Sequence, residues 1–189
     1  MALISASTIL TSLCLFHITL AYFFFTNPHV IADQALVWVL GEAMKMPQTQ
    51  LFLTPSPTSS LLAVMLFVLG LSDLISLSMP QEIWLVHYWG TQAPARIVIF
   101  GGLALFAYLT APPVPASISA RLHHPASALS YLGPAYGTAS GSDGLRNRVF
   151  LTLACLEVLS WFWAWVTLRE EAAAFAVRKR KRASSSAKP

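Results

Sequence analysis

Charged residues are scarce in this chain, and their scarcity excludes most soluble folds. Asp, Glu, Lys and Arg make up 11% of the 189 residues, whereas hydrophobic residues make up 56%. An average soluble domain carries about 25% charged residues, so water would not solvate a surface built from this composition. Several apolar runs instead approach the roughly 20 residues that cross the hydrocarbon core of a bilayer. The composition therefore predicts an all-α integral membrane protein.

Catalytic and metal-binding motifs are also missing from the sequence. The only two cysteines, Cys14 and Cys155, fall inside apolar runs, where we expect them to act as small apolar fillers. The chain has no Gly-rich phosphate loop, no His-x-x-x-His pair and no nucleophile elbow. His123 and His124 have no acid near them in the sequence, which favours solvated side chains over a metal site. We therefore expect no enzyme, no cofactor and no metal site.

Four apolar segments predict a four-helix membrane bundle, with spans at about residues 4–25, 61–78, 95–110 and 149–168. The third span is short, so its helix can begin nearer Trp89 and pass through Pro94 as a kink. Residues 28–45 predict an amphipathic helix that lies along the membrane interface and is ended by Pro47. Residues 111–147 are rich in Pro, Gly and Ser and predict a loop.

Basic residues are concentrated after the fourth span. From Arg169 onward there are seven Lys or Arg and two Glu, so this tail carries +5 and the rest of the chain −1 of the formal net charge of +4. Short basic segments beside a span stay in the cytosol, which predicts that both termini of a four-span protein lie there. We expect residues 169–189 to be largely disordered. Five basic residues are expected to contact anionic lipid headgroups: Arg178, Lys179, Arg180, Lys181 and Arg182.

Three ionisable side chains, those of His17, Asp73 and Glu157, fall within the predicted spans. Each costs at least roughly 2.5–3.5 kcal/mol to insert, so each needs a partner or a function. A rise of about 1.5 Å per residue places them roughly 20, 7 and 16 Å from the cytosolic ends of their helices. They can form a path for ions or protons, or they can hold helices together, with one acid paired to His17 or Arg96. We favour the second interpretation because three groups are few for a pore.

Aromatic and small residues near the spans have simpler interpretations. Five aromatic residues are expected at the level of the lipid headgroups: Trp84, Tyr88, Trp89, Trp163 and Trp165. The cluster before the third span can alternatively frame a lipid pocket together with the interfacial helix. Gly101 and Gly102 in the third span favour close helix packing.

Two blocks of sequence resemble a known family. LFHITLAYFFFTNPHVIADQALVWVLGEAM (residues 15–44) and LSDLISLSMPQEIWLVHYWGTQAPAR (residues 71–96) are similar to the fungal "increased loss of mitochondrial DNA" proteins. The resemblance covers the first three spans well and the fourth more loosely, and it does not extend to the loop or the tail. It implies a multi-pass protein of the endoplasmic reticulum membrane whose loss compromises the maintenance of mitochondrial DNA, and it supplies no catalytic residues.

The preferred hypothesis is a non-enzymatic endoplasmic reticulum membrane protein that supports mitochondrial DNA indirectly, through membrane or organelle homeostasis. Its expected partners are membrane lipids and other membrane proteins or further copies of itself. No direct contact with nucleic acid is expected, because the basic tail lacks interleaved aromatic residues. An ion channel or proton-coupled carrier that uses His17, Asp73 and Glu157 is the first alternative, and a lipid-binding membrane protein is the second.

Overall fold

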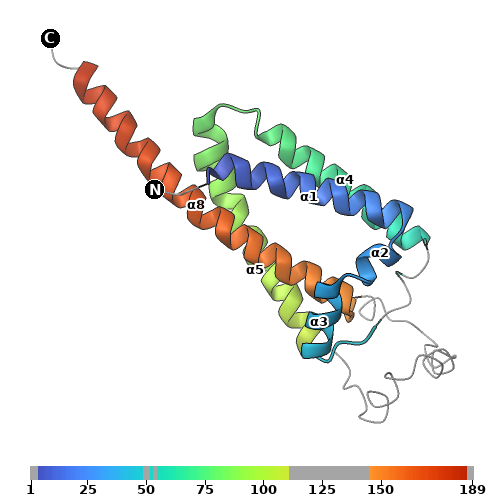
Figure 1. Cartoon of the computed structure of the whole chain (residues 1–189). Coiled ribbons are helices and arrows are strands. Elements are labelled where there is room, and N and C mark those ends of the chain that lie inside the picture. The colour runs from blue at the N-terminus through green and yellow to red at the C-terminus, as the bar shows by residue number, and fades with distance from the viewer. Residues whose placement is uncertain (1–3, 49–51, 53–54, 111–144, 187–189) are drawn as a thin grey trace, which may run out of the picture.

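A computed structural model describes residues 4–48, 52, 55–110 and 145–186 of the chain. These residues form helices and their connections, with no strand among them (Figure 1). Four helical stretches are long and apolar enough to cross a membrane: α1 (Ala6–Thr26), α4 (Pro57–Ser76), η2 (Ile83–Tyr88) continued by α5 (Trp89–Leu109), and the first part of α8 (Arg148–Ser186). The predicted all-α membrane protein is therefore confirmed.

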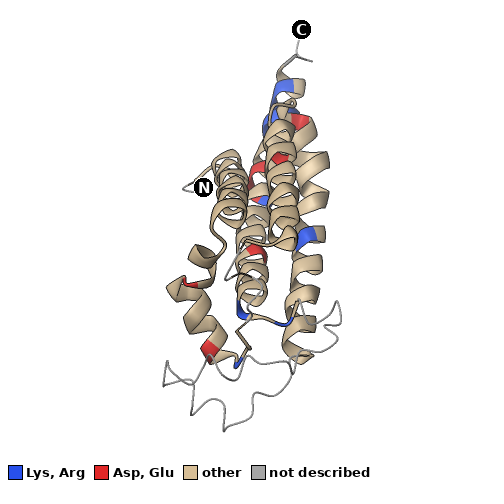
Figure 2. Cartoon of the chain, turned by 90° about the vertical axis from the view of Figure 1, so that its right-hand side faces the viewer, with Lys and Arg blue, Asp and Glu red and all other residues tan. Residues whose placement is uncertain are grey.

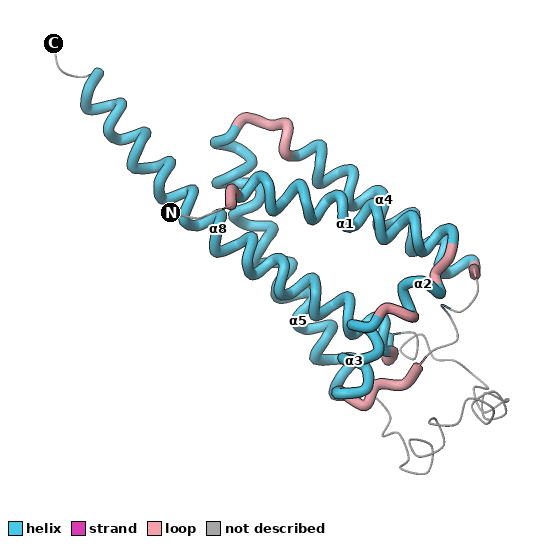
Figure 3. The backbone as a smooth tube through the Cα atoms, in the orientation of Figure 1, coloured by secondary structure: helices cyan, strands magenta, loops and turns pink. Residues whose placement is uncertain are grey.

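The four long helices pack as two antiparallel pairs, and α1 also contacts α8 (Figure 3). In the first pair, Phe24 near the end of α1 packs in one cluster with Ala63 near the start of α4. In the second pair, Ala107 at the end of α5 lies in a cluster with Leu151 near the start of α8. Both ends of the described chain consequently lie at the same end of the bundle (Figure 1).

A glycine sets the closest approach between α1 and α4. A Cβ atom on Gly70 would lie 2.9 Å from the carbonyl oxygen of Cys14 and 3.1 Å from the Cβ of His17. Such distances leave no room for any larger residue unless the backbones separate. The expected close packing at Gly101 and Gly102 is different in the structure, because a Cβ on Gly102 would meet nothing within 4 Å.

Local sequence signals explain where α4 begins. The Ser56 side chain accepts a hydrogen bond from the backbone of Ser59, whose own side chain accepts one from the Ser56 backbone, which completes a capping box. Pro57 occupies the first helical position, where its missing N–H costs nothing. The helix therefore starts before residue 61, the predicted start of this span.

The segment predicted as one interfacial helix over residues 28–45 is divided into two, α2 (His29–Ala32) and α3 (Ala35–Ala43). The backbone of Gln34 is extended between them. Arg148 explains why α3 lies where it does, because its Nε donates to the carbonyl of Met46 at 2.7 Å and its terminal nitrogen lies 3.0 Å from Glu42. Three large apolar side chains of α3 remain exposed: Leu36, Trp38 and Val39.

The third span is longer than residues 95–110. The π-helix η2 begins at Ile83 and leads directly into α5, which passes through Pro94 and ends at Leu109. The structure thus has the early start near Trp89 that the sequence allowed.

The expectation of a largely disordered tail is wrong as far as Ser186, because α8 continues through residues 169–186 without a break. This stretch contains several Ala and no Gly or Pro, so its composition favours a helix. Residues 187–189 of the tail and 111–144 of the predicted loop lie outside the residues that the structure describes.

Candidate functional site: a buried polar network

Two of the three intramembrane ionisable residues meet directly between α1 and α8. Nε2 of His17 lies 2.7 Å from Oε1 of Glu157, and the two residues are only 1% and 7% exposed. The other carboxylate oxygen of Glu157 accepts a hydrogen bond of 2.8 Å from the indole Nε1 of Trp161, one helical turn further along α8. Both oxygens of this acid are therefore occupied by protein donors.

The third of these ionisable residues, Asp73, is paired with a cation from the next helix. The two terminal nitrogens of Arg96 on α5 donate to the two carboxylate oxygens of Asp73 on α4, at 2.5 and 2.8 Å. Asp73 is 2% exposed. Such a planar bidentate pair is among the strong hydrogen-bonded arrangements, and it leaves no net charge at this point in the bundle.

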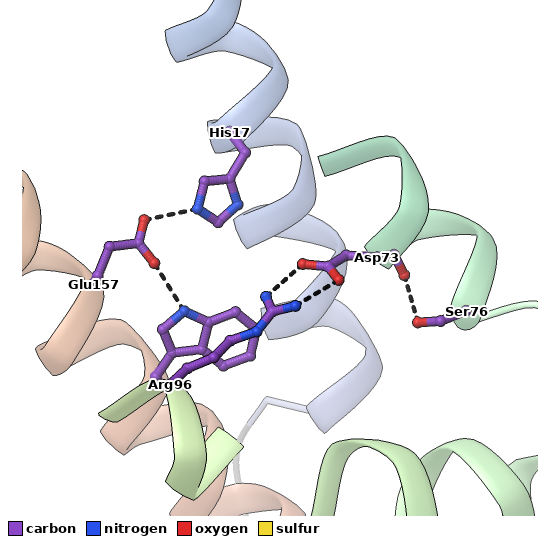
Figure 4. A network of polar contacts seen from close by, with 6 residues as sticks. His17, Asp73, Ser76, Arg96 and Glu157 are labelled. Carbon is purple, nitrogen blue, oxygen red and sulfur yellow. Dashed lines mark hydrogen bonds and ion pairs between the residues drawn. The ribbon is translucent and has the colours of Figure 1, made fainter. Parts of the chain in front are cut away.

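Trp161 joins the two pairs into one network (Figure 4). The guanidinium carbon of Arg96 lies 4.5 Å from the ring centroid of Trp161 and 5.3 Å from that of Trp89. The two indoles are stacked, with centroids 5.3 Å apart and an angle of 16° between their planes. A continuous set of contacts thus runs from α1 through α8 and α5 to α4: His17, Glu157, Trp161, Arg96 and Asp73.

The network constrains how the four spans can move relative to one another. A buried charge costs several kcal/mol of desolvation, which a hydrogen-bonded partner offsets, so removing one partner of such a pair costs about 3 to 5 kcal/mol. Each acid here is satisfied only while its partner on a neighbouring helix stays in place. Because every one of the four spans contributes a member, a shift of any span leaves a buried polar group without its partner.

Two buried nitrogen atoms of the network are still available for a hydrogen bond. Nδ1 of His17 and Nε1 of Trp89 are buried and have no hydrogen-bond partner within the described part of the chain. Among the same described residues, no group of three or more His, Cys, Asp or Glu side chains could hold a metal ion. Among the buried side-chain nitrogen and oxygen atoms of the described residues, Nδ1 of His17 is thus the one on a titratable side chain that has no hydrogen-bond partner.

Comparison with known proteins places the chain in a family. The family model described as increased loss of mitochondrial DNA protein 1 matches residues 4–178. This chain belongs to that family. Membership links it to the maintenance of mitochondrial DNA, and the matched region extends through the fourth span to Arg178, further than the resemblance of residues 15–44 and 71–96. No curated protein and no solved structure matches the chain.

The structure brings the three predicted site residues into one network, but they do not all contact one another. His17 and Glu157, expected roughly 20 and 16 Å from the cytosolic ends of their helices, touch each other, while Asp73 pairs with Arg96. Both His17 and Arg96 were expected as possible partners of an acid. Trp161 was not identified as a functional residue. Its spacing of four residues from Glu157 is the signal that predicts such a contact on a helix.

The aromatic residues divide into two groups. Trp84 and Trp89 are buried between the helices, and Tyr88 packs edge-on against Trp89, so these side chains contact protein. Their level relative to the lipid headgroups stays a prediction. Trp163 is 60% exposed, and Trp165 lies under the guanidinium of Arg169 at 5.1 Å. The π-helix over Ile83–Tyr88 has i→i+5 hydrogen bonds and therefore more residues in each turn than an α-helix, and it directly precedes the buried Trp89.

The five basic residues of the tail that are predicted to contact lipid are all exposed, near the end of α8. Lys179 makes the one contact with the body of the protein that the structure shows for this group, 2.9 Å from Glu82 in the turn between α4 and η2.

Proposed function

We propose that this protein is a non-enzymatic membrane protein of the endoplasmic reticulum that supports mitochondrial DNA maintenance indirectly. It acts as a rigid four-span scaffold that partners other membrane proteins through its lipid-facing helices, and it contacts membrane lipids through the tail of α8. In this proposal the effect on mitochondrial DNA passes through membrane or organelle homeostasis rather than through contact with nucleic acid.

One observation carries this proposal. All four carboxylate oxygens of Asp73 and Glu157 are occupied by donors from the protein itself. A permeation path needs acids that can release and rebind ions or protons, and acids in such paths face water-filled cavities. Acids that are held by Arg96, His17 and Trp161 serve helix association instead.

The proposed topology places both ends of the chain in the cytosol. The contact of 2.6 Å between the backbone N–H of Ala6 and Glu171 supports a shared side, because it joins the start of α1 to the end of the fourth span. The basic residues that follow Glu171 support the cytosolic side. An epitope placed after Pro189 is expected to be digested by protease in intact microsomes.

Loss of the protein followed by complementation tests the proposed role. In cells that lack it, wild type is expected to restore mitochondrial DNA copy number and to co-fractionate with endoplasmic reticulum markers. Glu157→Gln is expected to restore less, in proportion to a lower protein level, and Gly102→Ala is the matched control that restores fully. If Glu157→Gln accumulates to the wild-type level and still fails, the scaffold role is contradicted.

A proton carrier is the second candidate, and the unpartnered Nδ1 of His17 beside Glu157 favours it. Purified protein in liposomes separates the two candidates, with a pH-sensitive dye for protons and a potassium indicator for cations. The scaffold proposal predicts no flux above that of empty liposomes. Flux in the wild type that Glu157→Gln abolishes would establish the carrier instead.

A further inference from the structure

The C-terminal part of α8 projects beyond the membrane-spanning bundle (Figure 1). The helix has 39 residues, which corresponds to about 58 Å, whereas the hydrocarbon core is about 30 Å thick. Leu168 is the last residue of the helix that is buried in the protein core, and it is also the last residue of the fourth span predicted from the sequence. We therefore place the 18 residues after it beyond the hydrocarbon core.

Three contacts hold this projection in a fixed direction. Glu171 accepts the backbone N–H of Ala6 at the start of α1, where its negative charge also complements the positive end of the helix dipole. Phe175 packs against the hydrophobic core cluster. Lys179 lies 2.9 Å from Glu82 in the turn between α4 and η2. Because the contacts reach α1, the core and this turn, the helix cannot fold down onto its own membrane without breaking them.

The basic residues lie at the outer end of this fixed projection (Figure 2). Residues 178–182 are five consecutive Lys or Arg, and all five are exposed. Since successive residues turn about 100° around a helix, five in a row place positive charge on every side of it. They are 10 to 14 residues beyond Leu168, or about 15 to 21 Å along the axis. The headgroup layer on one side of a bilayer is only about 5 to 8 Å thick.

The composition of this end also argues against a helix that lies in its own membrane surface. A helix bound in the interface buries an apolar face among the lipid chains. From residue 178 to 186 the sequence is RKRKRASSS, in which Ala183 is the only apolar residue. Contact with a membrane at this end must therefore be electrostatic. A second membrane that approaches this end from outside can make such a contact.

We propose that residues 178–182 form a docking surface for the anionic phospholipid headgroups of a second membrane that faces this end of the bundle. Each Lys or Arg near an anionic surface contributes about fivefold in affinity. The interaction weakens as salt shortens the Debye length, which is about 10 Å at 0.1 M. The proposal requires a membrane-spanning bundle but does not depend on the organelle or on the role in mitochondrial DNA maintenance.

Vesicle capture by the full-length protein tests the docking surface. The protein is reconstituted into phosphatidylcholine vesicles with the tail outward, and these are mixed with labelled vesicles of phosphatidylcholine alone or with phosphatidylserine. Co-flotation is expected only with the phosphatidylserine vesicles, and it is expected to fall as salt is raised. Equal capture of both vesicle types, or of neither, would overturn the proposal.

Three variants distinguish the effect of charge from the effect of direction. Replacement of all five basic residues by Gln is expected to abolish capture, and replacement of Lys179 alone by Gln to weaken it only several-fold. Insertion of a flexible Gly/Ser segment after Val177 keeps the charges but frees their direction, and it is expected to reduce capture of the second membrane. If the protein prefers its own membrane when phosphatidylserine is placed there, and the insertion changes nothing, the fixed outward surface is refuted. Size-exclusion profiles of all three variants verify that the bundle is intact.

Discussion

At the scale of single residues, the sequence identifies which groups need partners but not all of the partners. His17, Asp73 and Glu157 could be selected because an ionisable group inside a bilayer needs a compensating contact. Trp161 could not be selected in the same way, because it lies in a Trp-rich stretch with Trp163 that resembles an interfacial belt. Only the rotation of α8 about its axis decides that one indole enters the core and the other faces outward.

Trp161→Phe is expected to destabilise the protein by about 2 to 4 kcal/mol. The substitution removes the N–H that satisfies one oxygen of Glu157 and reduces the ring that covers Arg96. The apparent free energy of unfolding in mild detergent measures the effect. Trp163→Phe is the matched control, and it is expected to change stability by less than about 0.5 kcal/mol because its side chain is exposed. Equal effects of the two substitutions would show that the indole N–H is unimportant.

At the scale of helices, apolar length predicts the spans well, and packing decides the rest. The adjacent glycines Gly101 and Gly102 favour close helix packing by sequence, yet it is at Gly70 that a missing side chain lets α1 and α4 meet. A single glycine in an apolar run gives no signal of which neighbour it faces. The composition of the tail favours a helix, but the contacts of Phe175 and Lys179 with distant segments cannot be predicted from the sequence.

Gly70→Ala is expected to cost about 1 to 3 kcal/mol of stability, because its Cβ would press on the backbone of α1, which cannot move as a side chain can. Gly102→Ala makes the same chemical change where a Cβ has open space. It is expected to be neutral or to stabilise the helix by up to about 1 kcal/mol. Thermal unfolding of the two purified variants compares them, and a loss of stability in Gly102→Ala as large as that in Gly70→Ala would contradict the assigned contact between α1 and α4.

At the scale of the whole molecule, the polar network joins helices that are far apart in the sequence. The number of spans and the shared side of their ends follow from the sequence pattern. The specific pairing of α1 with α4 and of α5 with α8 does not, because it depends on which faces of four similarly apolar helices are complementary. The network supplies that specificity, since only one arrangement places Asp73 against Arg96 and His17 against Glu157 at the same time.

The central claim is that the buried polar pairs hold the four spans together, and a double-mutant cycle on Asp73 and Arg96 tests it most directly. Asp73→Asn and Arg96→Gln each leave an unpaired buried charge, so each is expected to lower the unfolding free energy by about 3 to 5 kcal/mol. The double variant leaves no charge, and its loss is expected to fall short of the sum by about 1 to 3 kcal/mol.

The exposed pair Glu82 and Lys179 provides the control cycle, for which single and double Gln variants are expected to change stability by less than about 1 kcal/mol. Unfolding free energies of all variants in one detergent complete the measurement. A large coupling at Asp73 and Arg96 with little at the control pair is the predicted result. Additive losses at Asp73 and Arg96, or single variants as stable as the wild type, would contradict the account.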